Sequence, residues 1–182
     1  MKTEDSYKFL FEHINDIQFS DMIFEKIFAI SFTSKDYNLI KELLMYEIEL
    51  ILFYLKVLEF IDVKSFPNTY IVLKELNNRK VDNLFMILAF RYPKEMVLQA
   101  KINYNSQSKD TKAYAIEVID NMLSQDIKKL VLPIIEDVSN QKKLDDFKSI
   151  SFEMINEQKG FIEKVLSDNN IPLILKLSVL YE

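Results

Sequence analysis

The chain has 182 residues, enough for one domain with a sizeable core, and its 49% hydrophobic and 28% charged residues exclude a disordered chain. It has no cysteine, which excludes disulfide frameworks and thiolate metal sites, and its net charge of −5 argues against binding to nucleic acid. Because sheets depend on glycine for tight turns and Gly160 is the one glycine present, we predict a single all-α domain over residues 1–182.

The first 33 residues predict an N-terminal helical hairpin, with helices over about 5–17 and 20–31. Ser20 is a candidate N-cap of the second helix. Acidic residues occupy the positions where a signal peptide would carry basic ones. A cytoplasmic location is therefore expected.

A long central helix is predicted over residues 36–62, ending before Pro67. Its segment 43–61 has the length of a bilayer span, but four charges interrupt it, each costing about 2.5–3.5 kcal/mol at mid-membrane. Polar residues recur every seven positions and form one narrow strip along the helix: Lys35, Glu42, Glu49 and Lys56. We therefore expect a central helix with one solvent-exposed edge and no transmembrane segment.

Glu47 lies on the apolar side of this helix, opposite the polar strip and beside Ile51 and Tyr54. A carboxylate in apolar surroundings must find a partner or stay protonated. Two interpretations stay open. Glu47 bonds to a tyrosine hydroxyl or a helix N-terminus, or it is the acid of a ligand-sensing or catalytic pocket.

The rest of the chain predicts shorter helices, which brings the total to about 10–11. They are expected near 69–78, 81–91, 94–103, 110–123, 125–137, 143–157, 159–167 and 171–181. In the near absence of glycine, six asparagines are placed to adopt the left-handed conformation that ends helices: Asn38, Asn68, Asn78, Asn105, Asn140 and Asn170.

Apolar residues recur at an offset of 31. Phe85, Leu88, Tyr92 and Met96 project onto Ile116, Ile119, Leu123 and Ile127, and then onto Phe147, Ile150, Met154 and the polar exception Gln158. The pattern predicts helical hairpins over 69–182 that bury one face by stacking in a right-handed array.

The stretch "AYAIEVIDNMLSQDIKKLVLPIIED" resembles the HEAT-like repeats that follow the membrane part of bacterial ATP/ADP translocase-like proteins. The matching residues are Ala115, Glu117, Asp120, Asn121, Leu123 and Pro133, and the resemblance is strongest over 110–137. It implies a HEAT/armadillo-like α-solenoid, and it offers no catalytic residue. It also implies that the chain serves as a cytoplasmic region of a larger, membrane-associated polypeptide.

Glu117, Asp120 and Asn121 stand at helical positions i, i+3 and i+4, so they share one face. They predict a structural polar network that accepts hydrogen bonds from the free N–H groups of a neighbouring helix. The alternative is a site for a hard cation such as Mg²⁺ or Ca²⁺.

The last predicted helix is apolar on more than one side. Leu173, Leu177 and Leu180 are its candidate interface residues. Because a terminal repeat normally has a polar outer face, we expect this helix to be covered by a longer polypeptide or by an assembly, including a homo-oligomer.

One histidine and one glycine leave no paired-histidine metal motif, P-loop or dinucleotide turn, so no enzyme activity and no cofactor are predicted. The function predicted is a scaffold that binds a protein or peptide. The alternative is a sensor of a nucleotide or other small ligand with a pocket around Glu47.

Overall fold

The fold is taken from a computed structural model, which describes residues 9–10, 13, 20–29, 33, 36–148, 158–168 and 171–182. In these ranges all regular structure is helical, as the sequence predicts, and no helix is both long and apolar enough to cross a membrane. The predicted helix over 5–17 lies mostly outside the described residues, as does the second half of the one over 143–157. The helices are α2 Ser20–Ala29, α3 Tyr37–Phe60, α4 Pro67–Leu88, α5 Lys94–Tyr104, α6 Lys109–Met122, α7 Gln125–Ile135, α8 Asn140–Asp146, α9 Gln158–Ser167 and α10 Leu173–Leu180.

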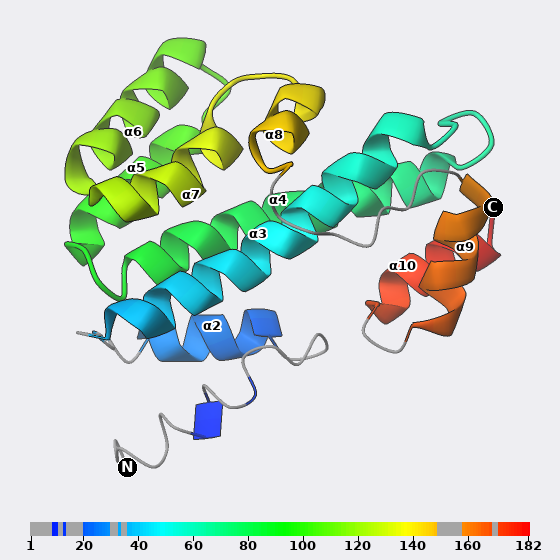
Figure 1. Ribbon diagram of the computed structural model, residues 1–182, viewed down its shortest axis with the longest axis horizontal. Coiled ribbons are helices and arrows are strands. Elements are labelled where there is room, and N and C mark those ends of the chain that lie inside the picture. Colours follow the sequence, from blue (N-terminus) through cyan, green and yellow to red (C-terminus); the bar gives the residue numbers. More distant parts are fainter. Residues whose placement is uncertain are drawn as a thin grey trace.

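Two long helices, α3 and α4, run back along one another and form the centre of the molecule (Figure 1). The Asp36 carboxylate begins α3 by accepting the N–H groups of Asn38 and Leu39 at 3.0 and 3.2 Å. Pro67 begins α4, at the position where its missing N–H costs no helical hydrogen bond. The polar strip on α3 is exposed at Glu42 and Glu49, as predicted.

Helix α4 is continuous, whereas the sequence predicted a break between 78 and 81. The expected break fell at Asn78, but asparagine is only mildly unfavourable inside a helix and no proline or glycine follows directly. The expected left-handed asparagine caps are also wrong here. Asn78 is helical, and Asn105 ends α5 at φ −81° and ψ 3°, on the right-handed side.

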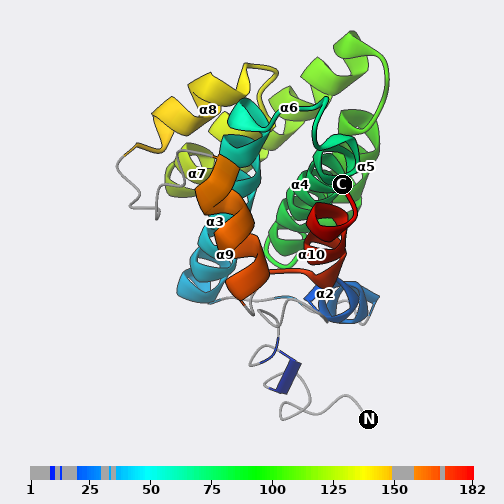
Figure 2. The same ribbon diagram turned by 90° about the vertical axis from the view of Figure 1, so that its right-hand side faces the viewer.

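Helices α5 to α8 pack at one end of the α3–α4 pair, and α9 and α10 pack at the other (Figures 1 and 2). Helix α2 lies on the side opposite α6 and α8 in both views. Serine hydroxyls cap two of the short helices: Ser108 accepts the N–H of Thr111, and Ser139 accepts that of Lys142. The side chain of Glu182 accepts the Thr69 N–H at 2.5 Å, which ties the end of the chain to the start of α4.

The described residues form two hydrophobic cores. The larger core joins α2, most of α3, the second half of α4 and α5 to α8, and it includes the fully buried Ile51, Leu84 and Ile127. The second, called here the C-terminal core, joins the end of α3, the first half of α4, α9 and α10. Its buried members are Tyr54, Val57, Ile61, Leu73, Leu76, Phe161, Val165, Ile171, Leu175 and Val179.

The 31-residue offset corresponds only in part to the packing of the described residues. Helices α5 and α6 pack closely on one another, and α6 also contacts α7. The third predicted hairpin falls partly outside the described residues; of its described parts, α8 packs against α3 and α7, and α9 packs against α3 and α10. The described part is therefore an all-helical domain in which the shorter helices gather around α3 and α4.

Candidate functional site

The outer side of α10 carries a stripe of exposed apolar side chains. Leu173, Leu177 and Leu180 are exposed by 66%, 40% and 62%, and Ile174 and Tyr181 are exposed beside them. Their spacing follows one face of the helix. The opposite face is buried in the C-terminal core. Helix α10 therefore presents apolar residues on two sides, as the sequence predicts, and one of them is open.

Glu47 is fully buried between α3 and α4. Its Oε2 atom accepts a hydrogen bond from Asn83 Nδ2 at 3.2 Å and lies 3.5 Å from Nζ of Lys80, which is also buried. From the sequence, Glu47 was expected to bond a tyrosine hydroxyl or a helix N-terminus or to serve as a pocket acid, and Lys80 was not foreseen. The sequence does not link Glu47 to Lys80, because Lys80 lies in a polar stretch of α4 whose pattern does not indicate that the side chain is buried.

The structure separates the members of the predicted polar network on α6. Asp120 forms an ion pair with Lys128 of α7 at 2.8 Å, while Glu117 and Asn121 are exposed. Asp120 therefore links two consecutive helices through an ammonium group. Among the described residues, no group of three or more acidic or histidine side chains is placed to hold a metal ion.

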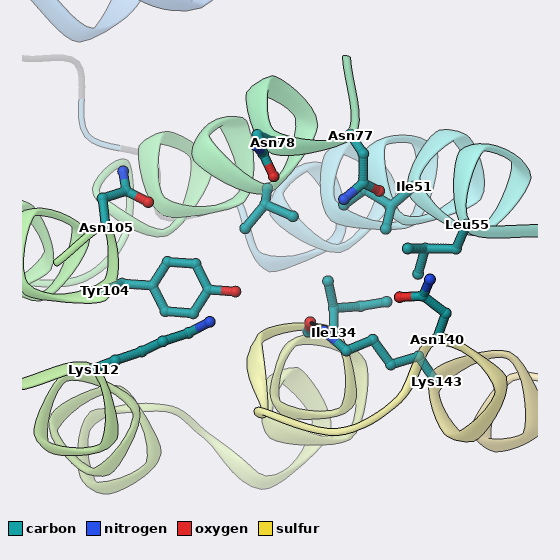
Figure 3. Close-up of a pocket in the computed structure, with 11 residues that line it drawn as sticks. Ile51, Leu55, Asn77, Asn78, Tyr104, Asn105, Lys112, Ile134, Asn140 and Lys143 are labelled. Atoms are coloured by element: carbon teal, nitrogen blue, oxygen red, sulfur yellow. Dashed lines mark hydrogen bonds between the residues drawn. The ribbon is translucent and has the colours of Figure 1, made fainter. Parts of the chain in front are cut away.

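A cavity of about 190 Å³ lies where α3 to α8 meet (Figure 3). Its lining among the described residues contains two lysines, four asparagines and one tyrosine, and no carboxylate. Ile51, Leu55, Asn77, Asn78, Val81, Tyr104, Asn105, Lys112, Ile134, Asn140 and Lys143 form its wall. Glu47 does not line it, although it precedes Ile51 by one turn of α3.

Tyr104 enters the cavity from the end of α5, and its ring packs on Phe85 at 5.2 Å between centroids. Burial, reinforced by the negative charges of Asp137 and Asp82, raises the pKa of Tyr104 to about 12. Its hydroxyl is therefore protonated at neutral pH. The Lys112 ammonium lies 4.6 Å from the centre of the same ring, in a cation–π contact.

Lys143 reaches the cavity from α8. Its Nζ donates a hydrogen bond to the Ile134 carbonyl at 2.5 Å, in the last turn of α7, where helix carbonyls lack backbone donors. Burial, followed by the charge of Lys112, lowers the pKa of Lys143, whereas Asp137 and Glu136 oppose that shift. Figure 3 shows the Lys112 and Lys143 side chains extending towards one another from opposite ends of the cavity.

Two asparagine side chains of the cavity, Asn105 and Asn77, differ in their hydrogen bonds. Asn105 is oriented by Asp82, whose Oδ1 accepts from Asn105 Nδ2 at 3.1 Å while its Oδ2 pairs with Lys101 at 2.9 Å. Asn77 Oδ1 is buried and has no hydrogen-bond partner among the described residues. The cavity was not predicted from the sequence, because its polar residues come from separate helices and share no spacing.

Comparison with protein-family models, curated proteins and solved structures gave no significant match. The resemblance to HEAT-like repeats thus stays a prediction from the sequence.

Proposed function

We propose that this protein is a non-enzymatic helical module that binds a protein or peptide partner through the exposed stripe of α10. The observation that carries the proposal is the row of open apolar side chains, among which Leu173, Leu180 and Tyr181 are each more than 60% exposed. Contiguous exposed apolar surface of this kind marks interaction sites.

The partner we propose is an amphipathic helix. The stripe follows positions 173, 174, 177, 180 and 181 of the chain, so its ridges match those of a second helix packed alongside. Only Lys176, half-buried, adds a charge within this helix, so the contact is mainly apolar. The resemblance to HEAT-like repeats supports the same proposal, because such repeats serve as scaffolds within larger assemblies.

The test begins with capture of proteins from a lysate of the source cells on the immobilised chain. Helices of the captured proteins are then made as synthetic peptides, and direct binding is measured by fluorescence anisotropy. We expect one peptide to bind the wild type, and we expect Leu177→Glu to weaken that binding at least about tenfold, since a charge in the centre of an apolar contact costs more than about 1.4 kcal/mol.

Ile102→Glu is the matched control, because Ile102 is an exposed apolar residue on α5, away from α10. It should leave peptide binding unchanged. Binding that survives Leu177→Glu would overturn the proposal. So would a wild-type protein that sediments as a dimer and becomes a monomer with Leu177→Glu, because a second copy would then be the occupant of the stripe.

A further inference from the structure

The cavity among α3 to α8 has a charge opposite to that of the whole chain. The protein carries a net charge of −5, yet the described lining of the cavity contains Lys112 and Lys143 and no carboxylate. The acidic neighbours lie outside the lining: Asp82 is paired with Lys101, and Glu136 and Asp137 are exposed. The two ammonium groups approach one another in this cavity, and the charge of Lys112 acts on Lys143.

We propose that this cavity binds a small organic anion. Its phosphate or carboxylate lies between Lys112 and Lys143, and its hydroxyl groups pair with the asparagine amides. Lysine ammonium groups bind phosphate and carboxylate as point charges, and both side chains approach the same space (Figure 3).

The remaining wall supplies the polar contacts that such a ligand requires. The protonated Tyr104 hydroxyl is a donor, and the buried Asn77 Oδ1 is an acceptor that no described residue bonds. A ligand hydroxyl that donates to Asn77 would remove the cost of burying that oxygen unpaired. An anion beside Lys143 would also offset the burial and the Lys112 charge that lower its pKa.

The size of the cavity limits the ligand. Its volume of about 190 Å³ is below the roughly 300–1,000 Å³ of pockets for drug-sized ligands. A phosphate or carboxylate on a short polyol fits this limit better than a nucleotide does. Glycerol 3-phosphate and glycerate are therefore suitable probes of the two anion types.

The experiment is calorimetric titration of the full chain with glycerol 3-phosphate, glycerate, inorganic phosphate and neutral glycerol. ¹H–¹⁵N spectra of the asparagine side-chain amides are recorded in parallel. We expect glycerol 3-phosphate or glycerate to bind and to shift the amide signals of Asn77 and Asn140, while glycerol does not bind. Which of the two binds more tightly identifies the anion as a phosphate or a carboxylate.

Lys112→Met is the deciding variant, because Lys143 also holds the end of α7 through the Ile134 carbonyl. It should weaken binding at least about tenfold, whereas Lys26→Met, an exposed lysine on α2 at the opposite side of the molecule, should not. The proposal is overturned if neither organic anion binds at up to about 10 mM. It is also overturned if Lys112→Met binds like the wild type, or if inorganic phosphate alone binds as tightly as the organic probes.

Discussion

The Lys80 ammonium and the Glu47 carboxylate are both withdrawn from water, with side-chain exposures of 7% and 0%. Removing two charges from water costs several kcal/mol each, and their attraction offsets that cost only when hydrogen bonds complete the shell. Asn83 supplies one such bond to Glu47. The pair therefore fixes how α3 and α4 face one another, and each member depends on the other.

Lys80→Met should destabilise the protein by about 3–5 kcal/mol, because it removes the ammonium group that lies beside the buried Glu47 carboxylate. The double variant Glu47→Leu with Lys80→Met should recover most of that loss. Urea unfolding measures both, and Lys74→Met on the exposed side of α4 is the control. A single variant as stable as the wild type would show that Glu47 does not depend on Lys80.

Tyr104 gives a prediction for alkaline pH. Its pKa is raised from 10.0 to about 12, so the folded state keeps a phenol that the unfolded chain would ionise. The raised pKa therefore contributes about 2–3 kcal/mol to the free energy of unfolding. This contribution is complete below pH 10 and is lost as the pH rises through about 12. Tyr104→Phe should lose less stability than the wild type across that interval in urea unfolding. Equal slopes for the two proteins would contradict the raised pKa.

At the scale of the helices, the sequence predicted elements well where a strong signal begins or ends them. The long helix was expected to end before Pro67, and α3 ends at Phe60 while Pro67 begins α4. The sequence prediction failed at Asn78, where a turn-forming residue type stands inside one continuous helix. Local preference could not decide this, because the packing of α4 along α3 stabilises the helix through that point.

The link between α6 and α7 is weaker than the sequence suggested. Asp120 pairs with Lys128 rather than with backbone N–H groups, and its side chain is 45% exposed. Asp120→Ala should therefore lower the free energy of unfolding by about 0.2–1 kcal/mol, as for other exposed pairs. Adding Lys128→Ala to the Asp120→Ala variant should lower it no further, because the ion pair is already lost. Thermal unfolding with and without Mg²⁺ checks the alternative. A rise in Tm with Mg²⁺ that Asp120→Ala abolishes would establish a cation site instead.

At the scale of the whole molecule, two kinds of site differ in how far the sequence reveals them. The stripe on α10 lies within one helix, so the spacing of Leu173, Leu177 and Leu180 was enough to predict it. The cavity takes its polar residues from four helices, α4, α5, α6 and α8. Lys112 and Lys143 could be brought together only by the packing of α5 to α8 on α3 and α4, which no local pattern encodes.

The two cores imply that the two ends of the α3–α4 pair differ in stability. The C-terminal core rests on α9 and α10, which have 10 and 8 residues, whereas the larger core is supported by α2 and α5 to α8. Helices this short are marginal without tertiary packing. Helices α9 and α10 should therefore open in excursions that leave the larger core intact.

Hydrogen exchange read by mass spectrometry tests this with two buried-residue variants. Leu175→Ala, in the C-terminal core, should cost about 2–5 kcal/mol and speed exchange in α9, α10 and the first half of α4, while α6 and α7 stay protected. Ile119→Ala is the matched variant in the larger core and should speed exchange in α6 and α7. If Leu175→Ala speeds exchange uniformly, then the two cores unfold as one unit. If it acts locally, then the stripe proposed to bind a partner lies on the less stable end, and a peptide bound there should slow exchange in α9 and α10 most.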